Sequence, residues 1–173
     1  MNWTDLLKAE IDEVYAATDG LMKHVDGDLS WKPSAENNWM SMGQLLLHLT
    51  NACGFCCHGF ATGDWGMPEG AELPEGEAML PPAEAMASVE TVEQARQKLA
   101  DDKALALRTI DETGEDNLTH KPAPAPWDPR PVPLGRRMLG MVQHLSQHKD
   151  QLFYYLKLQG KPVTTHTLYG MTP

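Results

Sequence analysis

Residues 134–159 read LGRRMLGMVQHLSQHKDQLFYYLKLQ, and this segment is the clearest indication of how the chain folds. Its apolar residues recur at spacings of three, four and seven, which places their side chains on one face of a helix. This stripe consists of Met138, Val142, Leu145, Leu152 and Leu156. Gly160 follows directly and Pro162 comes two residues later, as is typical of a helix end. The segment therefore predicts a long amphipathic helix that packs on a core.

Three further segments carry a helical pattern. The first has apolar residues at alternating steps of four and three. The other two open with a Ser or Thr followed three residues later by Gln, which is the spacing of a capping box: Ser41 with Gln44, and Thr91 with Gln94. The four predicted helices span about 3–24, 41–62, 89–113 and 134–159.

The segments between these helices are rich in glycine and proline. Residues 63–87 are predicted to be a long connection without firm internal structure, and residues 161–173 a C-terminal tail. No segment alternates between apolar and polar residues as a strand does. We therefore predict an all-α fold, a four-helix bundle with long loops between its helices, in a single domain over 1–173.

Charge and hydropathy exclude several classes of partner. The net charge is −10 with the histidines neutral, which argues against nucleic acid and against an anionic membrane surface. No apolar run approaches the roughly 20 residues that span a bilayer. The N-terminal residues lack the charged and apolar regions of a signal peptide. We expect a cytoplasmic protein that makes no contact with nucleic acid or membrane.

Three cysteines, Cys53, Cys56 and Cys57, lie within five positions. An odd number so closely spaced is a poor disulfide framework, so reduced thiols are expected. The predicted helix places them in its middle, whereas thiolates are favoured at helix N-termini. Cys56 lies eight residues after His48, about 12 Å along a helix axis, too far to bind the same ion. Packing as small buried side chains is the favoured interpretation.

Three histidines form the candidate site. His144 and His148 are four residues apart, so they lie one above the other on one helix face. His48 lies between Leu45 and Leu49 in the apolar face of another helix, where an unpaired ring costs about 1–3 kcal/mol. All three imidazoles are satisfied if they bind one cation, which leaves a further coordination position open. The alternatives are a hydrogen-bonded core histidine and a partly exposed helix face.

Gln151 and Tyr155 continue the row of His144 and His148, and are candidates either for contact with substrate or ligands, or for simple packing. If the helices alternate up and down, the three histidines lie at similar depth below one end of the bundle. The loops at that end carry Trp31, Trp39 and Trp127, which we expect at the rim of a pocket. A crossover in the long middle connection would remove this argument.

These motifs resemble the DinB/YfiT-like family. The resemblance rests on MGQLLLHL over 42–49 preceded by Trp39, on HLSQHKDQL over 144–152, and on WKP over 31–33. It implies a four-helix bundle, often a homodimer, with a divalent metal, typically zinc or nickel, on three histidines. The family's metal positions fall here on His48, His144 and His148.

The resemblance also favours one activity. Some members are similar to S-transferases that use a low-molecular-weight thiol, so the first hypothesis is a metal-dependent transferase acting on small molecules, with such a thiol as co-substrate. The second is a metal-dependent hydrolase, which would turn over without added thiol. The third is a non-enzymatic protein, either a metal-stabilised dimer or a ligand-binding protein, which would bind metal without turnover. No residue is singled out as a general base.

Overall fold

The computed structural model describes residues 2–36, 38–67 and 82–171. Their helices are α1 (Trp3–Met22), α2 (Met42–Leu49), α3 (Gly54–Thr62), α4 (Val92–His120), α5 (Leu134–Leu158) and the short α6 (Thr165–Leu168). A 3-10 turn, η2, covers Ala83–Ala85. The described residues contain isolated bridges but no named strand, so the all-α prediction is confirmed. None of the described helices is both long and apolar enough to cross a membrane.

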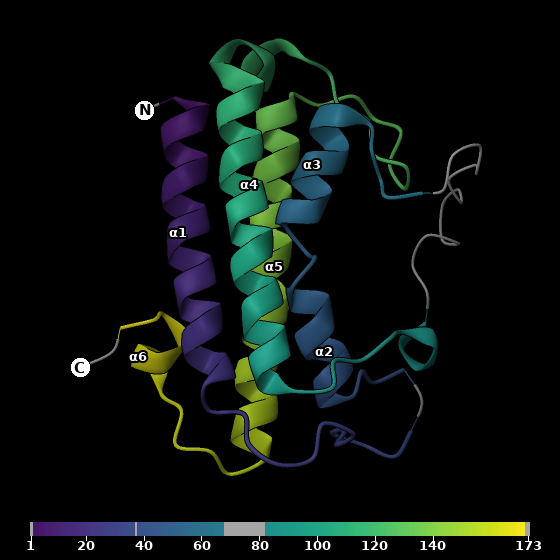
Figure 1. Cartoon of the computed structure of the whole chain (residues 1–173), viewed down its shortest axis with the longest axis vertical. Helices are drawn as coiled ribbons and strands as arrows, with labels where there is room; N and C mark the ends of the chain where they lie inside the picture. The colour runs from purple at the N-terminus through teal and green to yellow at the C-terminus, as the bar shows by residue number, and fades with distance from the viewer. Residues whose placement is uncertain (1, 37, 68–81, 172–173) are drawn as a thin grey trace.

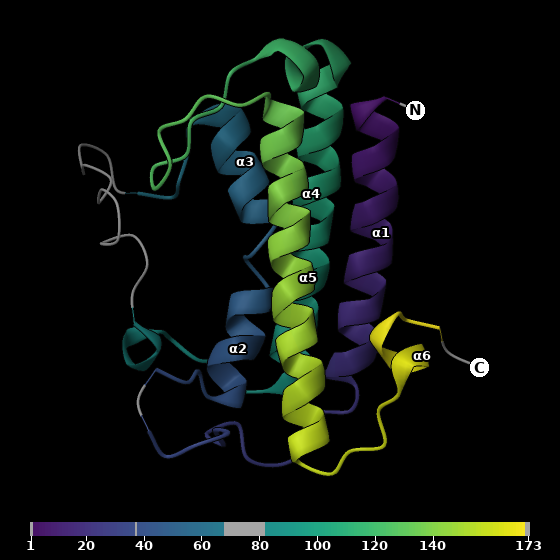
Figure 2. The same ribbon diagram turned by 180° about the vertical axis from the view of Figure 1, so that it is seen from behind.

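Three long helices, α1, α4 and α5, run side by side, and α2 and α3 follow one another along the fourth edge of the bundle (Figures 1 and 2). Successive helices do not simply alternate in direction along the bundle. Helix α3 ends at one end of the bundle and α4 begins at the other, so the chain between them spans its length. The loop before α2 and the loop before α5 therefore lie at opposite ends of the bundle, whereas the predicted pocket rim requires both loops at the same end.

The predicted apolar stripes form the core. In α5 all five predicted residues are buried, and in α1 the stripe is buried along its whole length. The buried stripe residues of the first and third predicted helices are Leu7, Ile11, Val14, Thr18, Leu21, Ala95, Leu99, Ala106 and Ile110. Burial of one continuous stripe per helix stabilises the bundle, since each buried aliphatic side chain contributes about 1.5–3 kcal/mol.

The helix predicted over 41–62 is wrong in its continuity, because it breaks between α2 and α3. Thr50 caps the end of α2, and Cys53 has φ −127° and ψ −65°, outside the helical region. At the break the Asp102 carboxylate of α4 accepts the N–H groups of Gly54 at 2.9 Å and Phe55 at 2.7 Å. A partner distant in sequence thus replaces the acceptors that a continuous helix would supply.

Gly54 is required where α3 begins. A Cβ atom at this position would lie 2.1 Å from the backbone oxygen of Asp102. The same carboxylate accepts the Tyr15 hydroxyl of α1 at 2.6 Å. One buried carboxylate therefore ties three helices together at the break.

Two further boundaries differ from prediction. Helix α4 continues beyond the expected end near residue 113 to His120, interrupted by Gly114 at φ 72° and ψ 158°. The tail is also not free, because its residues include α6, which packs beside α1. The buried Lys149 ammonium of α5 donates to the carbonyl of Leu168 at 2.9 Å and so anchors this segment.

The predicted connection 63–87 is described only at its two ends, and residues 68–81 lie outside the described part. Its last part contains η2. The Gln44 side-chain amide donates to the carbonyls of Ala83 at 2.9 Å and Met86 at 2.7 Å. Gln44 also accepts from the N–H of Ser41, which completes the predicted capping box of α2. The start of α2 thereby holds the segment that follows residue 81.

Candidate metal centre

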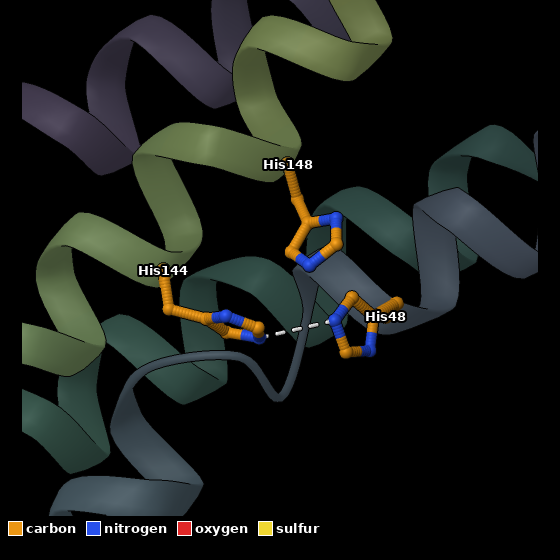
Figure 3. Close-up of side chains that lie close together, drawn as sticks. All are labelled: His48, His144 and His148. Atoms are coloured by element: carbon orange, nitrogen blue, oxygen red, sulfur yellow. Dashed lines mark hydrogen bonds between the residues drawn. The ribbon is translucent and has the colours of Figure 1, made fainter. Parts of the chain in front are cut away.

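The structure brings the three predicted histidines together. His48 comes from the last turn of α2, and His144 and His148 come from successive turns of α5 (Figure 3). One nitrogen from each ring lies within 4.8 Å of the others. The Nε2 atoms of His48 and His144 are 3.2 Å apart. Within the described residues, these three histidines are the group of side chains that could hold a metal ion.

Helices α2 and α5 begin at opposite ends of the bundle, contrary to the arrangement from which similar depths of the rings were predicted. His48 lies six residues after the start of α2 at Met42, or about 9 Å along its axis. His148 lies ten residues before the end of α5 at Leu158, or about 15 Å from the same end of the bundle. These depths differ by about 6 Å. The similar depth predicted from the beginnings of both helices is therefore wrong, because the chain crosses over between α3 and α4.

The spacing of the nitrogens fits a single ion. Two imidazole nitrogens, each about 2.0–2.1 Å from a tetrahedral ion, lie about 3.3 Å apart. The distance between His48 and His144 is 3.2 Å. The third nitrogen, from His148, lies within 4.8 Å of these two.

Electrostatics also fit metal binding. Burial, with the neighbouring imidazoles, lowers the pKa of His48 and of His144 to about 4. Burial also lowers the pKa of His148, opposed by its hydrogen bond to Gln151. The rings are therefore neutral at physiological pH and keep the lone pairs that a metal requires. Three neutral nitrogens suit a borderline divalent ion such as zinc or nickel.

A pocket of about 610 Å³ opens beside the three rings. Besides the histidines, its walls come from the loop before α2, from α2 and its end, and from the segment around η2. These lining residues are Asn38, Met40, Leu47, Asn51, Ala83, Ala85, Met86 and Ala87. Within the described residues the lining includes no Asp, Glu, Lys or Arg. Apart from the three imidazoles, its polar side chains are the carboxamides of Asn38 and Asn51.

Sequence analysis did not identify several of these lining residues. Asn51 follows His48 by three residues, a spacing that places neighbours on one side of a helix and could have indicated it. Asn38 is the described non-glycine residue with positive φ, at 73°. Asn is among the residues that tolerate this conformation. The segment around η2 gave no such signal, because it reaches the pocket only through tertiary contacts.

Gln151 and Tyr155 are connected to His148 through hydrogen bonds. The Oε1 atom of Gln151 lies 3.0 Å from Nδ1 of His148. The Nε2 atom of Gln151 donates to the Tyr155 hydroxyl at 3.1 Å, and that hydroxyl donates to the Met40 carbonyl at 2.9 Å. Burial raises the pKa of Tyr155, so its phenol stays protonated. Both candidates therefore adjoin the site, behind the imidazole rather than in the pocket.

The structure places the three tryptophans of the predicted rim at two different ends of the bundle. Trp31 and Trp39 pack against the Tyr155 ring, with centroids 5.5 and 6.4 Å away. Trp127 packs against Phe60 and Trp65 at the other end of the bundle, with centroids 5.8 and 6.0 Å away. The prediction for Trp127 is wrong because the chain crosses over between α3 and α4.

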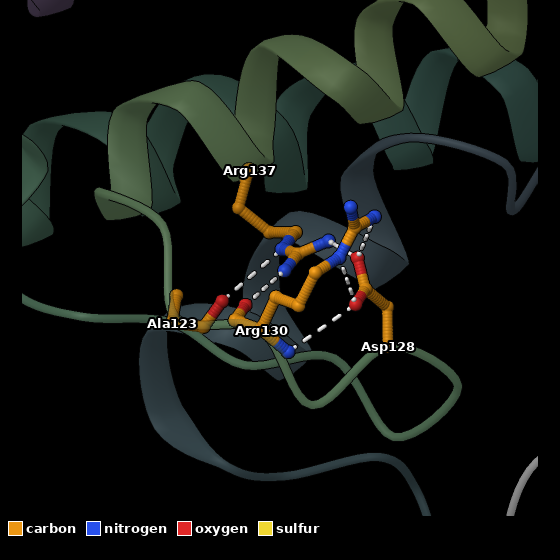
Figure 4. Close-up of polar contacts among 4 residues, drawn as sticks. All are labelled: Ala123, Asp128, Arg130 and Arg137. Atoms are coloured by element: carbon orange, nitrogen blue, oxygen red, sulfur yellow. Dashed lines mark hydrogen bonds and ion pairs between the residues drawn. The ribbon is translucent and has the colours of Figure 1, made fainter.

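The loop that carries Trp127 is held by Arg137 (Figure 4). Its guanidinium donates to the carbonyls of Ala123 at 3.1 Å and Arg130 at 2.9 Å. It also contacts the Asp128 carboxylate at 3.4 Å, and Arg130 donates to the same carboxylate at 2.8 Å. This network fixes the loop at the start of α5 and is remote from the histidines.

The cysteines occupy the start of α3, not the middle of a helix as predicted. Cys53 is the N-cap, and Cys56 and Cys57 lie in the first turn. Burial raises the pKa of Cys56 to about 12, and a hydrogen bond with Cys53 together with burial raises that of Cys57. The Asp102 carboxylate already accepts the N-terminal amides that could have stabilised a thiolate. The thiols of Cys56 and Cys57 therefore stay protonated, which agrees with a packing role.

Residues 10–152 match the sequence model of the DinB superfamily, which covers most of the chain. No curated protein and no solved structure matches the chain. The family match spans all three histidines, and the helical packing agrees with it.

Proposed function

The chain belongs to the DinB superfamily, and from this and the converging imidazoles we propose that it is a divalent-metal-dependent enzyme. The proposed reaction joins a low-molecular-weight thiol to a small electrophilic molecule. The observation that carries the proposal is the position of three neutral histidine nitrogens, within 4.8 Å of one another, beside an open pocket of about 610 Å³. When bound, the metal lowers the pKa of a thiol or water that reaches it and so supplies a nucleophile near neutral pH.

The lining of the pocket favours an uncharged electrophile. Met40, Leu47 and Met86 offer apolar surface, and burying a charged group against them without a partner is costly. The carboxamides of Asn38 and Asn51 can donate or accept hydrogen bonds and so orient a neutral polar group. The volume is within the range of small-molecule sites, about 300–1,000 Å³.

The absence of Asp, Glu and Lys among the described lining residues favours a thiol over water as the nucleophile. A free thiol has a pKa of about 8.5 and water one of about 15.7, so a thiol ionises near neutral pH with a smaller shift and without a protein base. In the proposed step the thiol releases its proton to solvent. Its sulfur forms a bond to the electrophilic carbon as the bond to the leaving group breaks, and the leaving group departs with that electron pair.

The test is turnover of a panel of neutral electrophiles with several low-molecular-weight thiols, with and without a chelator. We expect a rate that needs both thiol and metal, that is lost in His148→Ala, and that is kept in His166→Ala, a matched change at an exposed histidine. Turnover without thiol would instead support the hydrolase. Metal binding without turnover of any compound would support the ligand-binding alternative. The homodimer and the choice between zinc and nickel stay predictions.

A further inference from the structure

We propose that Gln151 and Tyr155 are positioning residues for His148. They would hold its ring in the tautomer with the proton on Nδ1, through a chain of hydrogen bonds that ends at the Met40 carbonyl. Such partners of a metal-binding histidine fix both its tautomer and its orientation. The inference extends the proposed metal site by naming the groups that prepare one of its rings.

The direction of every hydrogen bond between His148 and Met40 follows from the Met40 carbonyl, where the series ends. The Met40 carbonyl can only accept, so the Tyr155 hydroxyl, 2.9 Å away, donates its single proton there. The phenol oxygen must then accept from the amide nitrogen of Gln151, 3.1 Å away. This leaves the amide oxygen, an acceptor, facing Nδ1 of His148 at 3.0 Å. That nitrogen therefore carries the proton, and Nε2 has a free lone pair.

The opposite direction is disfavoured because it removes the donor from a partly buried carbonyl. In it, the Tyr155 hydroxyl would donate to Gln151, and the Met40 carbonyl would lose the proton that it receives at 2.9 Å. A carbonyl that loses its hydrogen-bond donor in a partly buried position makes that arrangement less stable. The phenol is held in place for its role, because Tyr155 is 1% exposed and Trp31 packs edge-on against its ring.

Of the three histidines, His148 is the one that these hydrogen bonds orient. Its second nitrogen is directed at the other two rings (Figure 3). Over the described part of the chain, the imidazole rings of His48 and His144 hydrogen-bond only to each other, so no other group selects their tautomers. Met40 also lines the pocket. The loop that forms one wall of the pocket therefore also orients a ring of the metal site.

The first test uses the metal-free wild-type protein with ¹⁵N-labelled histidine. The nitrogen chemical shifts and their couplings to ring protons assign the tautomer of each neutral imidazole. We expect His148 with the proton on Nδ1. A proton on Nε2 would overturn the proposal whatever the outcome of the activity assays, because this readout needs neither metal nor turnover.

The second test compares variants by zinc titration and by the same spectra. Gln151→Leu should weaken zinc binding about 10–100-fold and remove the tautomer preference of His148. Gln151→Glu should restore both, because a carboxylate oxygen also accepts from Nδ1. The matched control is Gln147→Leu, the same change at an exposed position of α5. Wild-type affinity and tautomer in Gln151→Leu would refute the role of Gln151.

Tyr155 is tested in the same way, against its exposed neighbour Tyr154. Tyr155→Phe keeps the packing of the ring but removes the hydroxyl that fixes the Gln151 amide. We expect a mixture of His148 tautomers in Tyr155→Phe and the wild-type tautomer in Tyr154→Phe. If both variants keep a single tautomer with the proton on Nδ1, the chain does not extend to Tyr155 and the proposal fails for that residue.

Discussion

Replacing Asp102 by alanine should destabilise the protein by about 2 kcal/mol. The carboxylate accepts the Tyr15 hydroxyl at 2.6 Å and the backbone N–H groups of Gly54 and Phe55 at 2.9 and 2.7 Å. The Tyr15 hydroxyl is buried, and leaving it without an acceptor costs about 1–3 kcal/mol. The buried N–H of Gly54 also donates to the Tyr15 hydroxyl at 3.1 Å, so it keeps one acceptor. The third donor, the N–H of Phe55, is partly exposed, so water can replace its partner. Relief of the desolvation of a buried carboxylate offsets part of the total.

The assay is urea unfolding of the metal-free protein, followed by its helical circular dichroism. Asp101→Ala is the matched control, since this neighbouring carboxylate is exposed and accepts only the Gln97 side chain at 3.0 Å. A change within about 0.5 kcal/mol is expected there. Asp102→Asn should fall between wild type and alanine, because it keeps one acceptor oxygen. If the free energy of unfolding of Asp102→Ala lies within about 1 kcal/mol of wild type, the break between α2 and α3 is not held as described.

Three further predictions concern other parts of the fold and site. Gly54→Ala should cost about 2 kcal/mol or more in urea unfolding, because its Cβ would lie 2.1 Å from a backbone oxygen; an unchanged midpoint would contradict this. In the metal-free protein the rings of His48 and His144 should titrate near pH 4, as followed by NMR of their ring protons. The free energy of unfolding should fall as pH drops from 6.5 toward 4, because unfolding then takes up protons. Titration near 6.5 would refute the burial of these two histidines as neutral rings. Lys149→Met should leave the Leu168 carbonyl without its donor, so α6 should become more accessible to hydrogen exchange; unchanged protection would show that α6 docks without it.

Much of the bundle follows from local patterns in the sequence. The stripe from Met138 to Leu156 faces the core because three- and four-residue spacing places it on one helix face. The same geometry places His144 and His148 together on α5. A single histidine among leucines was the signal for His48, because burial of its ring requires a partner.

The remaining features depend on contacts between distant segments. The break before Gly54 is set by Asp102, and no local pattern in 41–62 marks it as the end of a helix. The misplacement of Trp127 arose from the crossover between α3 and α4, which spacing along single helices does not reveal. The docking of α6 depends on a buried ammonium from α5, although the residues after Gly160 look like a polar tail.

The most direct test of the central claim is the metal content of the purified protein, measured by elemental analysis beside the variants His48→Ala and His148→Ala. Wild type should contain about one divalent transition-metal ion per chain, and each variant should lose it, because two nitrogens rarely hold such an ion alone. Equal metal content in all three proteins, or none in wild type after growth with zinc and nickel, would contradict a metal centre on these rings.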